Sequence, residues 1–441
     1  MHTQTFTTYH DVLAHLDQRG LFHMDFGLER IGKVLEALHV QRPAYDVIQV
    51  IGTNGKGSTS TFLASLAKAH GKRVGLYTSP HFITPRERIR IDGLMLDESA
   101  WPRLANAIFA VGGESLTYFE FLTVLAALAF AEAGVDVAIM EAGLGGSWDG
   151  TTAMAADLLC ATPIGLDHQA VLGNTIAAIA KDKAGAIREG QTVFIAPQEE
   201  AAMAEFVTMA RACAAELVLV DSTEMQKTAA LAHVSLGLRG PHQYINASVA
   251  LRAWEHLSCI RAWHLDEEAV SMGLQSARIA GRYDTVSHSA FPCPIILDGA
   301  HNPHGLQSLV NAIHHDKIEP SAVIFACLAD KDLDGLMPFL LDIGQGAPLI
   351  IPTIQNNERA LDGAVLAEHI NLQKQIVAGK NLRHIVPQAT AVPNMSEALS
   401  LAKQFAAQDE NISRDPSAPI VICGSLYLLA EFFTMFPELL D

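Results

Sequence analysis

The chain has 441 residues, of which 49% are hydrophobic and 18% are charged, and its formal net charge is −18. This length is expected to form two or three domains, and the apolar content excludes a disordered protein. The acidic balance excludes a general nucleic-acid or acidic-membrane binder, because such proteins need a basic face.

The cysteines and the N-terminus bear on the compartment. The six cysteines are scattered without a C-x-x-C pair, so we interpret them as buried thiols in a reducing compartment and not as a disulfide or zinc framework. The N-terminal segment has no signal-peptide core. The most apolar run, residues 121–140, contains Glu132 and Asp136 and is interpreted as a buried helix followed by a strand. We predict a cytoplasmic monomer without nucleic-acid or membrane partners.

Short apolar strands alternate with helical patterns along the chain. The first series has expected strands at 45–51, 74–79, 135–141, 158–168, 192–197 and 216–221, and expected helices at 58–70, 118–133 and 175–187. After a polar, proline-containing link at 284–294, further strands are expected at 294–301, 321–330, 347–353, 382–387 and 418–425. The alternation predicts an α/β fold with mostly parallel sheets covered by helices on both faces. We place the domain boundary near residue 287, with a second, smaller α/β domain after it.

The segment IQVIGTNGKGSTS, residues 48–60, resembles a phosphate-binding loop but departs from G-x-x-x-x-G-K-[S/T]. Val50 stands where the first glycine is expected, and Gly57 follows Lys56. The segment comes after a predicted strand and opens a predicted helix, an arrangement in which backbone N–H groups can bind an anion. A glycine-rich turn with an incidental lysine remains the alternative interpretation.

Polar side chains stand at the ends of other predicted strands. Ser79, Glu141, Asp167 and His168 each end or follow such a strand. Ligands of open α/β sheets bind outside the carboxyl ends of the strands, and an oxygen-rich set suits Mg²⁺ on phosphates. Taken singly, a strand-end glutamate is often a cap and a lone histidine is usually structural. Together with the loop that carries Lys56, these make four strand ends that supply Lys, Ser, Glu and His, and this combination favours nucleotide binding.

At this point the sequence resembles a known family. The segments GTNGKGS, YTSPHF with RERIRI, LTYFEFLTVLAALAF, EAGLGG, GLDHQAVLGNTIAAIAKDKAGAI, AGR, LDGAHNP and CGSL follow one another as in folylpolyglutamate synthase/dihydrofolate synthase, of the Mur ligase superfamily of ATP-dependent ligases. The resemblance runs from about Asp25 to Leu426. It implies a P-loop-type ATP-binding domain of the Mur ligase central type over residues 1–286, and a smaller Rossmann-like ligase domain over 287–441.

The resemblance also implies roles for individual residues. Lys56, Lys183 and His168 are expected to be catalytic, with Lys183 modified to a carbamate. Two magnesium ions are implied as cofactors. The expected ATP contacts are Gly55, Lys56, Gly57, Ser58, Asn246, Arg282, Asp298 and His301. The expected metal ligands are Ser79, Glu141 and His168. The expected pterin contacts are Asp25, Phe26, Gly27, Thr117, Tyr118, Phe119, Glu120, Trp148, Asp149 and Gly150.

Residue chemistry alone gives plainer interpretations for several of these positions. Without the resemblance Lys183 reads as a solvated helix lysine, and Tyr118 and Phe119 read as core residues at a helix start. The family usually continues GLGG with arginine and then L-D-A-T-N, whereas this chain has Ser147 and, after Asp149, no asparagine. The segment at 84–88 also differs, with Pro85 and Arg86. We interpret these departures as changes in substrate detail.

The implied function is ATP-dependent addition of L-glutamate to 7,8-dihydropteroate and to tetrahydrofolates through an acyl phosphate. Folylpolyglutamate synthase activity alone is one alternative. Another is a muramyl peptide ligase, although the phosphate loop begins at residue 52 and leaves no room for the N-terminal domain that those enzymes usually carry. A further alternative is a nucleotide switch without ligase chemistry, but such a protein would not need the segments DHQAVLG…KAG and LDGAHNP. A degenerate member with a structural role would not need the matched polar residues.

Overall fold

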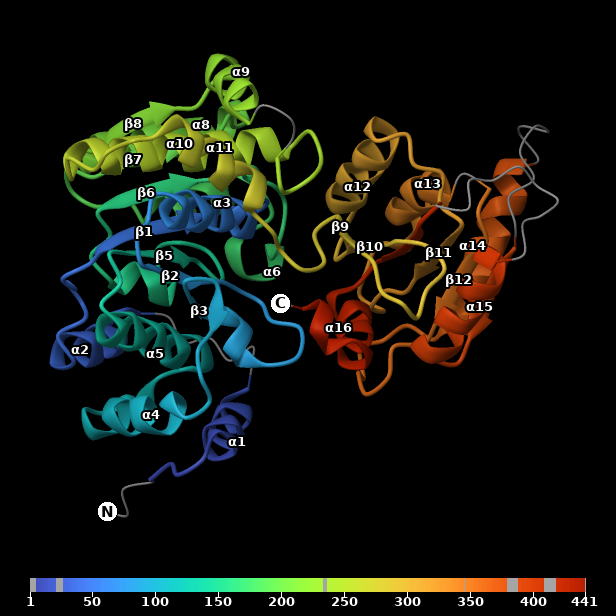
Figure 1. Ribbon diagram of the computed structural model, residues 1–441, viewed down its shortest axis with the longest axis horizontal. Helices are drawn as coiled ribbons and strands as arrows, with labels where there is room; N and C mark the ends of the chain where they lie inside the picture. The colour runs from blue at the N-terminus through green and yellow to red at the C-terminus, as the bar shows by residue number, and fades with distance from the viewer. Residues whose placement is uncertain are drawn as a thin grey trace. The chain divides into compact units, whose positions relative to one another are not determined.

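The computed structural model describes residues 5–20, 27–232, 236–344, 346–378, 388–407 and 418–440. The chain forms two compact units, one made of residues 1–237 and 243–277 and the other of residues 238–242 and 278–441. Each unit contains its own sheet (Figure 1). Residues 278–286, which the sequence analysis assigned to the first domain, lie in the second unit, because the strand β9 (Asp284–Val286) pairs antiparallel with β10 (Ile295–Asp298).

The first unit is built on an eight-stranded sheet. In spatial order its strands are β4 (Leu94–Met95), β3 (Ile89–Ile91), β2 (Val74–Tyr77), β5 (Val137–Glu141), β1 (Asp46–Ile51), β6 (Leu158–Ala161), β7 (Thr192–Ile195) and β8 (Glu216–Leu219). The strands from β2 to β8 in this order are parallel, and β3 and β4 form an antiparallel edge. β1 lies between β5 and β6, so the connection that leaves β1 emerges at the centre of the carboxyl edge, where ligands of such sheets bind.

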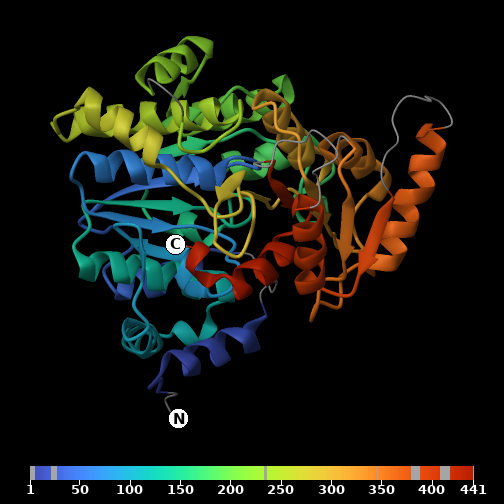
Figure 2. The same ribbon diagram turned by 45° about the vertical axis from the view of Figure 1, so that its right-hand side comes forward.

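Helices cover both faces of this sheet, as Figure 2 shows for α3 and α5. α3 and α10 pack on one face, and α5 packs on the other against β2 and β3. All residues of β1 are buried, with Val47 in a core that includes α5 and Ile51 in a core that includes α7 and α8. The helices of this unit are α1 (Tyr9–Arg19), α2 (Glu29–Ala37), α3 (Lys56–Ala69), α4 (Ala100–Ala110), α5 (Tyr118–Ala133), α6 (Gln169–Leu172), α7 (Ile176–Ala184), α8 (Glu200–Ala212), α9 (Ser222–Leu231), α10 (Gln243–Ile260) and α11 (Glu267–Ser276), with 3₁₀ turns η1 (Pro85–Arg88), η2 (Gly113–Ser115) and η3 (Gly150–Ala153).

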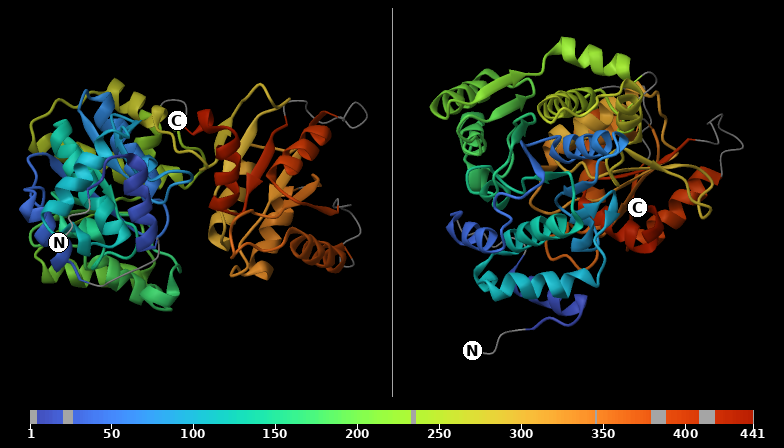
Figure 3. Two further views of the ribbon diagram at one scale, coloured as in Figure 1. Left: turned by 90° about the horizontal axis from the view of Figure 1, so that it is seen from below. Right: turned by 60° about the vertical axis from the view of Figure 1, so that its left-hand side comes forward.

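The second unit has a six-stranded sheet that is parallel except for β9. Its strand order is β13 (Ala389–Val392), β12 (Leu349–Pro352), β11 (Ala322–Phe325), β14 (Ile420–Cys423), β10 and β9. Side chains of α12 and α13 form the core on one face, and α15 and α16 pack on strands of this sheet (Figure 3). The helices are α12 (Pro303–His315), α13 (Leu333–Gly344), α14 (Gly363–Ala378), α15 (Met395–Ala407) and α16 (Leu426–Met435), followed by η4 (Pro437–Leu439).

The predicted α/β class with mostly parallel sheets is confirmed. The strand predicted at 158–168 is wrong in its length, because β6 ends at Ala161. Pro163 follows shortly and has no N–H to extend the ladder. Its carbonyl accepts hydrogen bonds from the backbone N–H groups of Thr53 and Asn54, at 3.1 and 3.2 Å. The strand predicted at 382–387 lies outside the described residues.

The cysteines and the most apolar helices were also subjects of prediction. All six cysteines are free thiols, but only four are buried, since Cys213 is half-buried and Cys259 is exposed. None of the helices in the described ranges is long and apolar enough to span a membrane.

Candidate active site

The phosphate-loop segment connects β1 to α3 at the centre of the first sheet. Gly55 precedes the helix in the left-handed conformation, with φ of +89°, and Gly52 has φ of +140°. A Cβ on Gly52 would lie 1.9 Å from Thr162 Oγ1, and a Cβ on Gly55 would lie 2.2 Å from Asn246 Oδ1. Both positions therefore require glycine for conformation and for space. The loop leads into the N-terminus of α3, whose backbone N–H groups can bind an anion.

Two lysines meet on this loop. Lys56 Nζ donates to the carbonyl oxygens of Gly52, at 3.1 Å, and Thr53, at 3.3 Å. Lys183 Nζ, from α7, donates to the same Gly52 oxygen at 2.8 Å. Only 3% of the Lys183 side chain is exposed, so the interpretation of a solvated lysine is wrong. Burial first, and then the charge of Lys56, lower the pKa of Lys183 to about 7, which gives a substantial neutral amine fraction near neutral pH.

The predicted metal ligands lie at or beyond neighbouring strand ends. Glu141 is the last residue of β5 and is 3% exposed, and its Oε2 accepts a hydrogen bond from the backbone N–H of Ser79 at 3.1 Å. Ser79 lies two residues after β2, the parallel neighbour of β5. A hydroxyl and a carboxylate at adjacent strand ends are hard oxygen donors and fit Mg²⁺.

His168 is placed differently from the prediction. It lies seven residues after β6 in the left-handed conformation, with φ of +50°, and its side chain is 55% exposed. Its Nε2 is 3.8 Å from a carboxylate oxygen of Asp167. Among the described residues no three or more histidine, cysteine or acidic side chains gather as a metal site. The predicted set, Ser79, Glu141 and His168, contains only two residues of these types.

Asn246 belongs to α10, which packs along α3. Its Oδ1 lies against Gly55, its carbonyl accepts a 3.5 Å hydrogen bond from Thr59 Oγ1, and its Nδ2 donates to Gln243 Oε1 at 2.9 Å. Asn246 is 3% exposed. The structure therefore brings this predicted ATP contact to the phosphate loop, together with the side chains of Lys56 and Lys183.

In the second unit, Asp298 ends β10 and organises the turn that follows. Its carboxylate accepts hydrogen bonds from the backbone N–H groups of Tyr283, at 2.7 Å, and Ala300, at 2.8 Å. Burial raises the pKa of Asp298, while the nearby guanidinium of Arg282 opposes that shift. His301 Nδ1 lies 2.8 Å from the Gly299 carbonyl. The predicted residues Arg282, Asp298 and His301 thus belong to one turn region of this unit.

Comparisons with known proteins bear on what this arrangement is. The family model of the Mur ligase glutamate ligase domain matches residues 281–425. A dihydrofolate synthase/folylpolyglutamate synthase of Escherichia coli is 33% identical over 79% of this chain and 84% of its own length. The chain belongs to the folylpolyglutamate synthase/dihydrofolate synthase family. It is therefore a member of the Mur ligase superfamily of ATP-dependent ligases.

Other members of the family extend the comparison. A probable bifunctional folylpolyglutamate synthase/dihydropteroate synthase of Haloferax volcanii is 29% identical to this chain. The match includes 96% of this chain and 50% of the length of that protein. The structure of E. coli FolC in complex with DHPP and ADP has a TM-score of 0.79 and 27% identity, with 98% of each chain covered. A Yersinia pestis bifunctional enzyme complexed with AMPPNP and a Mn ion has a TM-score of 0.79 and 28% identity, again with 98% of each chain covered.

Part of the segment expected to bind the pterin in this family builds the start of α5. Thr117 caps the helix, and the Glu120 carboxylate accepts from the Thr117 backbone N–H at 2.8 Å, which forms a capping box. Glu120 also pairs with Arg30, with Nε at 2.9 Å and Nη2 at 3.0 Å. Tyr118 is buried, as the residue-based interpretation expected, and Phe119 is half-buried with its ring 5.6 Å from that of Tyr77.

The other expected pterin residues are distributed over two segments. Asp149 is buried, and its carboxylate accepts from the backbone N–H groups of Gly143, Leu144 and Thr151 at 2.8 to 3.0 Å. Trp148 is 55% exposed. Gly150 begins η3, and a Cβ there would lie 3.4 Å from the Phe119 ring. Gly27 is described, whereas Asp25 and Phe26 lie outside the described residues.

The segment that begins at Ser147 is bound to α7 by hydrogen bonds. Ser147 donates from its N–H and its hydroxyl to the Asp182 carbonyl, at 3.0 and 2.7 Å. Gln49, which the sequence analysis missed, donates from its buried side chain to the hydroxyls of Thr151 and Thr152 at 2.9 and 2.6 Å. A polar residue inside the apolar strand VIQVI was the signal that could have identified it.

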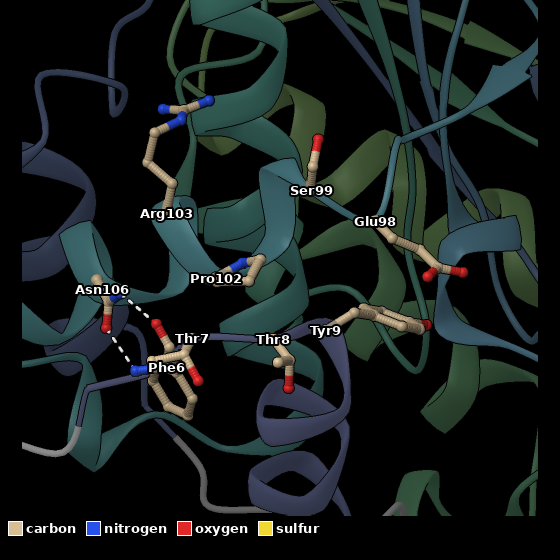
Figure 4. Close-up of a pocket in the computed structure, with 9 residues that line it drawn as sticks. All are labelled: Phe6, Thr7, Thr8, Tyr9, Glu98, Ser99, Pro102, Arg103 and Asn106. Carbon is tan, nitrogen blue, oxygen red and sulfur yellow. Dashed lines mark hydrogen bonds between the residues drawn. The ribbon is translucent and has the colours of Figure 1, made fainter.

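A separate surface pocket lies beside α1 and α4 (Figure 4). Asn106 exchanges hydrogen bonds with the backbone of Phe6 there, at 2.9 and 2.8 Å. The charged residues Glu98 and Arg103 pair with Arg86 and Glu132. The pocket includes none of the predicted site residues, and its lining consists of Phe6, Thr7, Thr8, Tyr9, Glu98, Ser99, Pro102, Arg103 and Asn106.

Proposed function

We propose that this chain adds L-glutamate to 7,8-dihydropteroate and to tetrahydrofolates with consumption of ATP. The observation that carries the proposal is the convergence of Lys56 and Lys183 on the Gly52 carbonyl, inside a loop in which a side chain at Gly52 or Gly55 would clash. This arrangement supports binding and activation of a triphosphate at the start of α3. Family membership supports glutamate and a pteroyl or folyl acceptor as the other substrates.

The proposed reaction has two steps. A carboxylate oxygen of the acceptor attacks the γ-phosphorus of ATP, the bond to the ADP oxygen breaks, and an acyl phosphate forms. The amine of L-glutamate then attacks the acyl carbon, phosphate leaves, and the amine loses a proton as the amide forms. Lys56 releases the loop carbonyls and reaches the outer phosphates, where its charge stabilises the oxygens that gain charge.

Lys183 is proposed to carry a carbamate. Its low pKa supplies the neutral amine, whose nitrogen forms a bond to the carbon of CO₂ and loses a proton, while one C=O bond becomes C–O⁻. The product is a negatively charged carbamate beside the Lys56 ammonium. Electrostatic attraction between these two groups replaces the repulsion between two ammonium groups. The buried position of Lys183 supports this role over that of a surface lysine.

Ser79, Glu141 and His168 are proposed as ligands of magnesium, with two ions in the complete site. Mg²⁺ bound there would neutralise phosphate charge. The adjacency of Ser79 and Glu141 supports this assignment, as does the Mn ion in the Yersinia pestis structure. In the same way Gly55, Gly57, Ser58, Asn246, Arg282, Asp298 and His301 remain proposed ATP contacts. The predictions of a cytoplasmic location and of a monomer are kept as proposals.

The test is ADP release by the purified protein with Mg·ATP and L-glutamate, in which 7,8-dihydropteroate and a tetrahydrofolate are compared as acceptors. Turnover with both supports the bifunctional proposal. Turnover with the tetrahydrofolate alone supports the second candidate, folylpolyglutamate synthase activity only, which the altered segment around Ser147 favours. If neither acceptor gives ADP release, the proposed function is rejected.

A further inference from the structure

Arg88 is a buried cation without a carboxylate partner in the described part of the chain. Its residue exposure is 5%, and it lies at the junction of η1 and β3 in the first unit. Its Nε donates to His81 Nδ1 at 2.7 Å, and its guanidinium carbon lies 5.6 Å from the centre of the Tyr118 ring. Its two terminal nitrogens have no hydrogen-bond partner among the described residues. The two Nη atoms of Arg88 are not fully buried, so a ligand can reach this edge of the guanidinium.

Three buried carboxylates of the first unit, Glu87, Glu120 and Asp149, already have partners. Glu87, the neighbour of Arg88 in sequence, accepts hydrogen bonds from the backbone N–H groups of residues 82–84, each at 2.7 Å. Glu120 caps α5 and pairs with Arg30. Asp149 accepts the backbone N–H groups of its own loop. A buried charge is costly unless it is paired, and the described residues supply no carboxylate to the Arg88 guanidinium, so an anionic ligand would stabilise it.

The surroundings hold the guanidinium in one orientation. His81 Nδ1 accepts the hydrogen bond from Arg88 Nε at 2.7 Å and so fixes one edge of the guanidinium. The Arg88 carbonyl accepts from the backbone N–H of Thr78 at 2.9 Å, which fixes the backbone beside Ser79. With Nε occupied, the two terminal nitrogens form the fork that binds a carboxylate through two parallel hydrogen bonds.

We propose that Arg88 binds a carboxylate of the acceptor substrate, with His81 and Tyr118 as positioning residues. The anchor lies beside Tyr118 in the segment expected to receive the pteroyl group, and its backbone adjoins the strand end that carries Ser79. This inference rests on the proposed function. An acceptor carboxylate would supply the missing negative charge without any new protein partner.

The test compares Arg88→Gln with Arg90→Gln in the full chain. Arg90 is two residues further along, is only half-buried and carries the same charge, so it is a matched control. We expect Arg88→Gln to raise the KM for at least one acceptor by about ten-fold or more, with the KM values for ATP and glutamate nearly unchanged. Arg90→Gln should leave all three values nearly unchanged. Arg88→Lys, which keeps the charge but loses the fork, should give an intermediate rise.

Dihydropteroate has one carboxylate and a tetrahydrofolate has two, so the pattern identifies which group is held. A rise with both acceptors assigns Arg88 to the reacting carboxylate, and a rise with the folate alone assigns it to the α-carboxylate. Unchanged acceptor KM values in a folded Arg88→Gln protein, or a rise confined to glutamate, would overturn the proposal.

A binding measurement separates this inference from the proposed function. Dihydropteroate is titrated into wild type, Arg88→Gln and Arg88→Lys without ATP, with ligand-induced fluorescence as the readout and circular dichroism as the folding check. A wild type that binds dihydropteroate but releases no ADP rejects the activity and still tests the anchor. A tetrahydrofolate is titrated in the same way, and equal dissociation constants of both acceptors for wild type and both folded variants reject the anchor alone.

Discussion

Lys56 Nζ and Lys183 Nζ donate to the same carbonyl oxygen, that of Gly52, at 3.1 and 2.8 Å. The two lysines come from α3 and α7, which start after different strands of the first sheet. Two full positive charges at one acceptor repel each other, and Lys183 is also buried. The arrangement is therefore most stable when Lys183 is neutral or has become an anion.

Removal of the Lys56 amine should nearly abolish ATP turnover. Lys56→Ala is expected to lower kcat by at least about 100-fold, because a charge aimed at the phosphates is lost from a preorganised site. The measurement is ADP release at saturating substrates. Lys68→Ala is the control, since Lys68 lies on the same helix but is exposed and donates to the Asp92 carbonyl. Near-normal turnover in Lys56→Ala would show that the loop between β1 and α3 does not bind the phosphates through Lys56.

Lys183→Ala should lose activity that small carboxylates partly restore. The reason is that a short carboxylate can occupy the space of the lost lysine and replace the negative end of the proposed carbamate. ADP release is measured with and without a millimolar series of short carboxylates. Lys181→Ala, an exposed position on the same helix, should keep wild-type turnover. Inactivity without any restoration would count against the carbamate.

The pKa of Lys183 makes stability depend on pH. Its pKa is about 7 in the folded chain against an ordinary 10.5, so the unfolded chain binds more protons between these values and stability rises with pH across that window. The burial penalty is fully present below pH about 7 and is on the order of a few kcal/mol. Lys183→Met should therefore be more stable than wild type near pH 7, with a difference that shrinks towards pH 10.5. Urea unfolding of both proteins at several pH values measures this, and a difference that does not change with pH would contradict the shift.

Thr117 should act through the helix that it caps. Thr117→Ala is expected to cost about 1 kcal/mol of unfolding free energy through loss of the cap, and Thr117→Ser should restore most of it. Chemical denaturation measures both. Thr434→Ala is the control, since that hydroxyl donates to Ala430 within a helix and is no cap. If Thr117→Ala left stability intact and raised only the acceptor KM, a direct pterin contact would replace the structural role.

Several features followed from local sequence. The helix expected at 118–133 is confirmed as α5, which the structure shows to be capped by Thr117 and followed by Gly134 in the left-handed conformation at φ of +64°. The strand DVIQVI and the helix after the phosphate loop were also predictable, because apolar runs and glycine turns act within a few residues. The length of β6 was not predictable from apolar residues alone, since Pro163 ends the ladder there.

The sequence by itself determined the α/β class, the order of the elements, the family and which residues carry chemical groups, because periodicity and motif spacing are local properties of the chain. Only the tertiary structure decided how those groups meet. It buried Lys183 on the Gly52 carbonyl, exposed His168, and left the buried Arg88 without a carboxylate partner among the described residues. Burial and charge pairing depend on segments far apart in sequence, and these long-range contacts set the pKa of Lys183 and the unpaired charge of Arg88.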